Sequence, residues 1–372
     1  MLDEIRVLDL TRLYPGAYCS KFLADYGAEV IKIEEPVKGD YLRDLSKDVD
    51  SMDARFINLN MGKKSITLNL KMIEDYDFFI ELVKNSDVLL EGFRPGVMNK
   101  LNLSYETLKE VNSKLIYCSL TGFGQTGPYA DYAAHDLNIL GLSGLATYFK
   151  DSNNKPVIPG IQISDLAGGS LMALSSILLA LFYREKSEKG QYIDVSMLDG
   201  TISLMVSLFP KMFSEDNLSL SKGRLNGGLA YYNLYETKDN KWISVACLEY
   251  KFWEKFCSIM NRPEWLELHN EDENIQKQLK KDLKDTFIKE NQSFWIEKFF
   301  YSDCCVTPVL NLHEVKDDPQ INNRKILSQI TLDGKNKYSY QVGKPFKMSA
   351  DFYKKERKAP RKGQNNQDFL KF

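Results

Sequence analysis

The sequence predicts an α/β protein in which a parallel β-sheet is covered by helices on both faces and a second, smaller α+β region follows. Short apolar runs alternate with amphipathic segments over the first 120 residues, a pattern typical of consecutive βαβ units. Beyond residue 230 the pattern changes to two short strands followed by helices. The length of 372 residues suggests about two domains.

The elements of the first half follow in order. The first βαβ unit comprises a strand at 5–10, a helix at 17–26 and a strand at 29–33, and Gly27 is a natural end for the helix. The alternation continues with strands at 65–70, 87–90 and 115–120 and helices at 72–84 and 105–111. Ser104 is predicted to cap the helix that starts at residue 105.

The later elements are predicted in the same way. A long helix at 165–186 begins with the small residues 167–170, a strand follows at 192–196, and a helix at 198–209 is stopped by Pro210. Residues 211–229 are rich in Ser, Asn and Gly and predict a linker. Strands at 231–235 and 242–246 predict a hairpin, and helices are expected at 250–260, 275–289 and 294–300. The charged run 276–284 favours a solvated helix face over a membrane or nucleic-acid site.

Composition excludes several function classes. The hydrophobic fraction of 43% argues against a disordered chain, and a net charge of −2 gives no basic field for nucleic acid. Six cysteines without a CxxC pair, with three histidines, argue against a zinc cluster and predict reduced, buried thiols. The start lacks the basic and apolar regions of a signal peptide, and the apolar stretch 171–183 falls short of a membrane span. We therefore expect a cytoplasmic protein without a membrane partner.

Four motifs are candidates for chemistry, each with a structural alternative. Residues 122–127 match GxGxxG, but Pro128 and the absence of an amphipathic helix after it favour a turn over a dinucleotide site. His135 suits a helix start or a catalytic role. Asp165 and Glu249 each suit a helix cap or a carboxylate held near a ligand. Arg94, between Phe93 and Pro95 at a strand end, suits a phosphate ligand or a surface turn.

Several motifs together resemble one family, the class III CoA-transferases (CaiB/BaiF type), which also contain the α-methylacyl-CoA racemases. They include Leu23-Ala-Asp-Tyr-Gly-Ala-Glu-Val-Ile-Lys-Ile-Glu34, Glu91-Gly-Phe-Arg-Pro-Gly-Val-Met98 and Leu120-Thr-Gly-Phe-Gly-Gln-Thr-Gly-Pro128. Segments 5–12, 39–40, 59–65, 189–197 and 305–310 continue the match in order over nearly the whole chain.

The resemblance implies a Rossmann-like large domain at 1–210, the linker at 211–229, a small domain at 230–325 and a C-terminal segment at 326–372 that returns to the large domain. It also implies an interlocked homodimer. The substrate would be an acyl-CoA thioester, with coenzyme A as part of the substrate and no metal, nicotinamide or other cofactor. A place in lipid metabolism would follow.

The resemblance also implies the catalytic residues. In the family's transferases an aspartate attacks the acyl-CoA and becomes an aspartyl-CoA thioester, and it aligns with Asp165. In the racemases the same aspartate is an acid/base, completed by a histidine and a glutamate. These align with His135, in His135-Asp-Leu-Asn138, and Glu249, in Leu248-Glu-Tyr-Lys-Phe252, where Tyr250 replaces the family's proline. We expect a racemase of 2-methylacyl-CoA thioesters, with a CoA-transferase using Asp165 as nucleophile as the alternative.

The chemistry of these residue types agrees with a racemase. Inversion of an α-carbon needs one group to remove a proton and another to return one from the opposite face. Histidine titrates near neutrality, a carboxylate with a raised pKa can serve opposite it, and Glu249 would orient His135. Backbone N–H groups at the predicted helix start 167–169 would bind the enolate oxygen.

Residues that align with CoA contacts of the family complete the expected site. They are Leu68, Asn69, Leu70, Lys71, Gly92, Phe93, Arg94, Lys100, Ala134, Asp136, Leu137, Asn138 and Ile139. The family often has an arginine near the adenine where this chain has Glu35, and Lys38 or Arg43 is the expected substitute.

Overall fold

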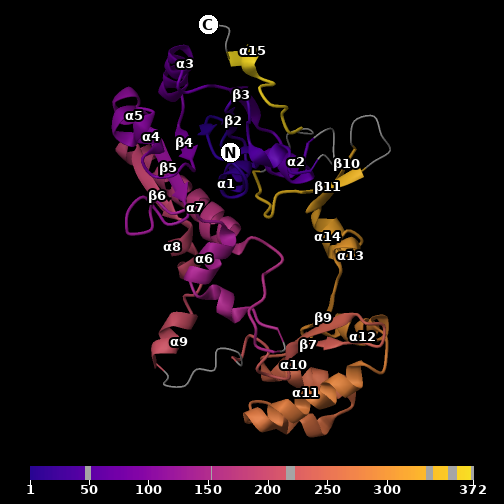
Figure 1. Cartoon of the computed structure of the whole chain (residues 1–372). Coiled ribbons are helices and arrows are strands. Elements are labelled where there is room, and N and C mark those ends of the chain that lie inside the picture. The colour runs from indigo at the N-terminus through magenta and orange to yellow at the C-terminus, as the bar shows by residue number, and fades with distance from the viewer. Residues whose placement is uncertain (47–51, 152, 215–222, 332–337, 351–357, 370–372) are drawn as a thin grey trace. The chain divides into compact units, whose positions relative to one another are not determined.

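The computed structural model describes residues 1–46, 52–151, 153–214, 223–331, 338–350 and 358–369, and the chain divides into two compact units (Figure 1). Unit 1 comprises Met1–Phe149, Pro156–Pro210 and Lys325–Phe372, and unit 2 comprises Lys150–Lys155 and Lys211–Arg324. Part of the expected linker, 215–222, and parts of the expected C-terminal segment, 332–337, 351–357 and 370–372, lie outside the described residues.

Unit 1 is built on a six-stranded sheet with the order β3-β2-β1-β4-β5-β6. The strands are β1 (Arg6–Asp9), β2 (Glu29–Glu34), β3 (Lys64–Thr67), β4 (Val88–Glu91), β5 (Ile116–Thr121) and β6 (Gln191–Ser196). All neighbouring pairs are parallel, so the predicted parallel sheet is confirmed. The order reverses between β1 and β4, and in open sheets of this kind ligands bind beside such a reversal, at the carboxyl ends of the strands.

Helices cover both faces of this sheet, as predicted. Alternate strand residues point to opposite faces, so that Val7 belongs to one core and Leu8 to the other. The core around Val7 is closed by α1 (Pro15–Asp25) and α7 (Met172–Ser187). The core around Leu8 is closed by α3 (Ile73–Lys84), α4 (Val97–Lys100) and α5 (Tyr105–Val111).

Local signals placed several of these helices correctly. The Ser104 hydroxyl accepts a hydrogen bond from the Thr107 N–H at 3.2 Å, and α5 has the predicted bounds. Gly27 follows α1 with a φ of +117°, a conformation that glycine adopts without strain. Further helices of unit 1 are η1 (Tyr41–Arg43), α2 (Ala54–Asn60), α6 (Asp136–Leu142), η2 (Leu145–Tyr148), η3 (Ser164–Leu171), α8 (Met197–Ser203) and α15 (Asn366–Phe369).

The helix predicted at 198–209 is wrong in its extent. In the structure α8 ends at Ser203 and a separate helix, α9 (Leu208–Ser214), contains Pro210. Pro210 lies in the first turn of α9, where the missing N–H of proline has no partner within the helix anyway. Pro210 therefore helps to start a helix instead of ending one.

The long helix predicted at 165–186, which contains the apolar stretch 171–183, is confirmed to within one residue at each end. η3 and α7 run on without a break as the helix Ser164–Ser187, which has 24 residues. Its most apolar window of 18 residues has a mean hydropathy of 1.8, enough by length and composition to cross a membrane. Residues such as Ala173 and Ile177 pack in the core against the sheet. Leu179 and Phe182 on the other side of α7 are 69% and 65% exposed.

The C-terminal segment runs along the outer strand of the sheet. The Ser65 N–H donates to Asn365 Oδ1 and the Thr67 N–H donates to Asn366 Oδ1, each at 2.9 Å. This segment therefore covers the hydrogen-bonding groups that the edge strand β3 would otherwise expose. A hairpin of β10 (Leu327–Thr331) and β11 (Tyr338–Val342) precedes it.

Unit 2 is an α+β unit with its own core. Its antiparallel sheet has the order β7-β8-β9, formed by β7 (Tyr232–Glu236), β8 (Trp242–Ala246) and β9 (Val306–Val309). The predicted hairpin is confirmed. The helices are α10 (Tyr250–Met260), η4 (Pro263–Leu268), α11 (Glu273–Phe287), α12 (Gln292–Phe299), η5 (Phe300–Ser302), α13 (Leu312–Val315) and α14 (Pro319–Arg324). Aromatic side chains such as Trp253, Phe256 and Phe287 fill the core.

Replacing Gly200 with alanine is expected to destabilise unit 1 by about 3 kcal/mol, because overpacking a close contact costs about 1–3 kcal/mol or more. A Cβ atom at Gly200 would lie 1.8 Å from the Gly168 carbonyl oxygen, where η3 crosses α8. The measurement is the free energy of unfolding in urea. Gly141→Ala in α6 is the matched control, because a Cβ there meets no atom within 4 Å. Equal stability of the Gly200→Ala variant and the native protein would contradict the close crossing.

Candidate active site

Asp165 lies in the first turns of η3, which is a π-helix. The cap position of η3 is occupied by Ile163, two residues before Asp165, and Ile163 already has helical backbone angles. The interpretation of Asp165 as a helix cap is therefore wrong. The Asp165 N–H donates to Asp136 Oδ1 at 2.9 Å, and its carbonyl oxygen accepts from the Ser170 hydroxyl at 2.8 Å. The backbone around the carboxyl group is therefore fixed from two sides. Single π-helical turns are frequent at functional sites.

The environment of Asp165 changes its acidity. Burial of the half-buried carboxyl group raises its pKa to about 7, and the nearby charge of Asp136 contributes in the same direction. The Asp165 carboxyl group therefore gains and loses its proton near neutral pH. A carboxyl group in this state can both accept and donate a proton at the pH of a cell.

His135 occupies the cap position of α6, next to Asp136. The backbone N–H of His135 donates to Asn138 Oδ1 at 3.0 Å, and the residue is exposed in unit 1. Because Asp136 accepts the hydrogen bond of Asp165, the start of α6 is joined directly to η3. The structure therefore brings together the two segments that carry the predicted proton-transfer residues.

Glu249 belongs to unit 2, at the cap position of α10. Its side chain accepts no capping hydrogen bond, so an ordinary capping role is not supported. The residue is exposed, and burial together with the charge of Glu249 raises the pKa of the Cys305 thiol. The pairing of Glu249 with His135 stays a prediction.

The segment 167–169 lies in the first turns of the helix as predicted, but the structure argues against the prediction that its N–H groups bind the enolate oxygen. These residues lie inside η3, and a π-helix bonds each N–H to the carbonyl five residues earlier, so the N–H groups of Gly168 and Gly169 are used within the helix. Both glycines serve packing instead. A Cβ atom at Gly168 would lie 2.4 Å from Thr201 Oγ1 and one at Gly169 would lie 3.0 Å from Met197 Cγ.

The residues predicted to contact CoA follow the carboxyl ends of the strands or begin α6. Residues 68–71 follow β3, residues 92–94 follow β4, and Lys100 ends α4. The side chains of Leu68 and Ile139 are packed in the two cores, which leaves only their backbone for a ligand. Lys71, Arg94 and Lys100 are exposed cations.

The prediction that Arg43 replaces the family's arginine near the adenine is wrong. Its Nε and Nη2 donate to the two oxygens of Glu34 at 2.8 and 2.6 Å, and its Nη1 donates to the Pro360 carbonyl at 3.0 Å. Arg43 is buried, and these bonds occupy its guanidinium. Another cation, Arg12, has its guanidinium carbon 5.1 Å from the ring centre of Tyr41 and 5.7 Å from that of Phe93.

A buried charge network was also missed. Lys63 Nζ contacts Asp9 Oδ2 at 3.2 Å, Ser20 Oγ at 2.7 Å and Asn60 Oδ1 at 2.9 Å, all in the interior. Asp9 in turn accepts from the N–H and hydroxyl of Thr11, so the network fixes the turn between β1 and α1. The sequence signal for this network is Asp9, an acidic residue at the end of an otherwise largely apolar strand.

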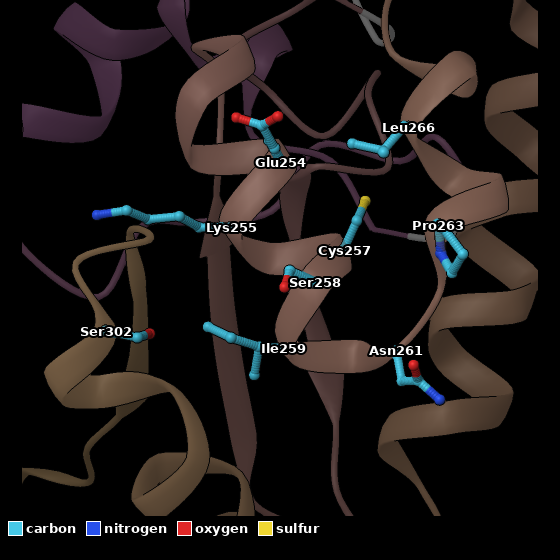
Figure 2. Close-up of a pocket in the computed structure, with 9 residues that line it drawn as sticks. All are labelled: Glu254, Lys255, Cys257, Ser258, Ile259, Asn261, Pro263, Leu266 and Ser302. Carbon is cyan, nitrogen blue, oxygen red and sulfur yellow. The ribbon is translucent and has the colours of Figure 1, made fainter.

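A surface pocket of about 710 Å³ lies entirely within unit 2. Figure 2 shows α10 in its middle, with Pro263 and Leu266 on one side and Ser302 on the other. None of the predicted site residues lines it. Its thiol, Cys257, is a poor nucleophile because burial raises its pKa to about 12.

Metal ligands and disulfides do not organise the site in the described part of the chain. No group of three or more His, Cys, Asp or Glu side chains there is placed to hold a metal ion. All six cysteines are free thiols, five of them buried and Cys305 exposed.

Comparison with known proteins identifies the family of the chain. The protein belongs to CoA-transferase family III, whose model matches residues 2–366. It is 36% identical over 330 residues to the α-methylacyl-CoA racemase of Homo sapiens. The alignment covers 84% of this chain and 79% of the racemase. It is 34% identical over 333 residues to the acetyl-CoA:oxalate CoA-transferase of Acetobacter aceti, with 87% and 85% covered.

A solved structure supports the same assignment. A CAIB/BAIF family protein from Brucella suis superposes with a TM-score of 0.86 at 26% sequence identity, covering 99% of this chain and 98% of that one. The protein is therefore an enzyme of the superfamily that contains family III CoA-transferases and the related racemases.

Proposed function

We propose that the protein is an epimerase that inverts the α-carbon of 2-methylacyl-CoA thioesters. The observation that carries the proposal is Asp165, whose pKa is raised to about 7 and whose backbone is joined to the segment that starts with His135. A 1,1-proton transfer requires two groups that can each accept and donate a proton, and a carboxyl group with a raised pKa and an imidazole are such groups. The similarity to the human α-methylacyl-CoA racemase supports the same reaction.

The proposed reaction proceeds through an enolate. One group of the pair, Asp165 or His135, removes the α-proton, and the electrons of the C–H bond move to the thioester carbonyl. The other group returns a proton to the opposite face of the α-carbon. For the opposite epimer, Asp165 and His135 exchange the roles of base and acid. In this scheme Glu249 orients the His135 side chain. The substrate is an acyl-CoA thioester, and we propose that no further cofactor takes part.

A CoA-transferase is the second candidate, and the similarity to acetyl-CoA:oxalate CoA-transferase favours it. In this reaction the ionised Asp165 carboxylate attacks the thioester carbonyl and CoA thiolate leaves. The thiolate then attacks the aspartyl carbonyl of the resulting mixed anhydride, the donor's carboxylate departs, and an aspartyl-CoA thioester remains. An acceptor carboxylate then attacks this thioester, and the same two steps in reverse give the acceptor's CoA thioester and the free Asp165 carboxylate. Both reactions use the same aspartate on the same fold.

The two candidates are separated by incubating one 2-methylacyl-CoA epimer in D2O without any acceptor acid. An epimerase is expected to incorporate deuterium at the α-carbon while the epimer ratio moves toward equilibrium. If several acyl chains show neither change, carboxylic acids are added and the enzyme is treated with hydroxylamine or borohydride. Modification of Asp165 then, together with CoA transfer, would identify a transferase and contradict the epimerase proposal.

We propose in addition that two copies of the chain form a homodimer. Apolar side chains on one side of α7, including Leu178, Leu179, Phe182 and Tyr183, are 41–69% exposed within the single chain. A row of large apolar residues on one helix is typical of a surface that another chain covers.

A further inference from the structure

Three side chains form a row across the strands near the carboxyl edge of the sheet. Glu91 on β4 pairs with Ser119 on β5, and Ser119 pairs with Asp194 on β6. Cross-strand partners in register point to the same face, so the three polar groups are neighbours. The Tyr192 hydroxyl donates to Ser119 Oγ at 3.2 Å, and the Ser119 hydroxyl bonds to the Glu91 carboxylate. None of these groups has a part in the proposed reaction.

Each acid of the row holds one turn at this edge. Glu91 Oε2 accepts a hydrogen bond from the Phe93 N–H at 2.8 Å. Both oxygens of Asp194 accept from the Gln125 N–H, at 3.1 and 3.0 Å. Gly124 has a φ of +81°, and a Cβ atom there would be in ordinary van der Waals contact with Asp194 Oδ1 at 3.5 Å, so this part of the turn 122–127 lies beside Asp194. The positive φ of Gly124 accounts for the glycine at this position of the GxGxxG match without a dinucleotide.

The two turns follow β4 and β5 at the carboxyl edge of the sheet, and ligands of open parallel sheets generally bind at this edge. The first turn carries Arg94, an exposed cation directly after β4. At the second turn, Thr121 Oγ1 and Gln125 Nε2 are buried and, among the residues that the structure describes, find no hydrogen-bond partner. Buried polar atoms without a protein partner are uncommon and indicate atoms available to a ligand or to water.

We propose that Glu91 and Asp194 are positioning residues for acyl-CoA: they hold the turns 92–94 and 122–127 in the conformation that receives the ligand, and the protonation of Glu91 sets how tightly the first turn is held. The inference rests on the proposed use of an acyl-CoA substrate. It adds two residues and a pH-dependent step of binding that are separate from the proton transfer at Asp165.

The surroundings of Glu91 make this protonation relevant at neutral pH. Burial raises its pKa to about 7, and the charge of Asp194 contributes, while the bonds from Ser119 and the Phe93 N–H oppose the rise. The other titratable groups near it are Tyr117, Cys118 and Tyr192, and burial raises the pKa of each, which keeps them neutral. Asp194 is thus the charge that acts on Glu91.

The sign of the effect follows from the hydrogen bonds. Above pH 7 the ionised Glu91 accepts charge-assisted bonds from the Phe93 N–H and the Ser119 hydroxyl, which are roughly twice as strong as neutral ones. Below pH 7 the neutral acid must donate one proton and accepts more weakly. The turn that carries Arg94 is therefore expected to be held more firmly, and CoA to bind more tightly, as the pH rises through about 7.

The test compares the binding of free CoA to the native protein and to Glu91→Gln by isothermal titration calorimetry between pH 6 and 8.5. Gln mimics the neutral acid, and comparison at the same pH cancels the titration of the phosphates of CoA. The ratio of the two dissociation constants is expected to be close to 1 at pH 6 and to reach about 10 at pH 8.5. Glu81→Gln, an exposed acid on α3, is the control and is expected to give a ratio of 1 throughout. A Glu91→Gln ratio that does not change with pH would overturn the proposal.

A second measurement is independent of any ligand. Glu91→Leu is expected to speed amide hydrogen exchange in the turn 92–94 by at least about 10-fold, and Asp194→Ala to do the same for 122–127, with the rest of unit 1 unchanged. Unchanged exchange in both turns, or a loss of protection throughout unit 1, would show that the row does not position them. If exchange responds as expected but the native protein binds no CoA, the proposed function fails and the positioning of the turns stands.

Discussion

Replacing Asp165 with asparagine is expected to lower kcat by about 10³-fold for either candidate reaction. The carboxyl group is the proton-transfer group of the epimerase and the nucleophile of the transferase, and general acid–base catalysis contributes about 10²–10⁴-fold. The hydrogen bond from the N–H of residue 165 to Asp136 is a backbone interaction and remains in the variant. The measurement is the initial rate of epimerisation, or of CoA transfer, at saturating acyl-CoA.

The variant is expected to fold normally. Since burial raises the pKa of Asp165 from 3.8 to about 7, ionisation costs folding free energy, and stability from this group falls as the pH rises from about 4 to 7. A neutral asparagine avoids this cost at pH 8, so its unfolding midpoint in urea should be unchanged or higher. Glu185→Gln, an exposed acid on α7, controls for the loss of a carboxylate. A kcat within a few-fold of the native value in Asp165→Asn would remove Asp165 from both mechanisms.

The pH profile of the native enzyme separates the two roles of this carboxyl group. A nucleophile must be ionised, so kcat/KM of a transferase is expected to rise with pH through about 7 and then stay level. An epimerase needs one proton shared between Asp165 and His135, so its kcat/KM should pass through a maximum. The profile must be the same in both directions of epimerisation, because the equilibrium constant between the epimers does not depend on pH.

The fold was predictable because its elements are set by local patterns. The apolar strands and the Ser104 cap need only a few neighbouring residues, and both were found at the expected places. The break of the predicted helix at 198–209 depends on tertiary contacts that no local pattern contains. There α8 is held against η3 through the pair Gly168 and Gly200, which meet at backbone distance.

The sequence allowed prediction of which residues form the site, but not of the surroundings that set their acidity. The resemblance named Asp165 and His135, but the raised pKa of Asp165 arises from burial and from Asp136, and neither is visible in a motif. Arg43 failed for the same reason, because its bonds to Glu34 become apparent only once β2 and η1 are folded together. Charged residues at the ends of apolar strands, such as Asp9 and Glu91, are the signal in the sequence that indicates these buried networks.

Replacing His135 with alanine is expected to abolish epimerisation, by about 10³-fold, while one epimer still exchanges its α-proton. If Asp165 and His135 act on opposite faces of the α-carbon, Asp165 alone removes and returns the proton on its own face. The epimer with its α-proton on that face should thus incorporate deuterium with retention of configuration, and the other epimer should be inert. The measurement is the deuterium content and configuration of each epimer after incubation in D2O.

The same variant discriminates against the transferase. A transferase that uses Asp165 as nucleophile does not need an imidazole at position 135, so His135→Ala would leave CoA transfer within a few-fold of the native rate. His313→Ala, an exposed histidine on α13, is the matched control for loss of an imidazole and should leave either activity unchanged. Binding of free CoA should also persist, since the Asn138 side chain still accepts the N–H of residue 135. Full epimerase activity in His135→Ala would exclude the two-base mechanism, and exchange lost from both epimers alike would place His135 in substrate binding instead of proton transfer.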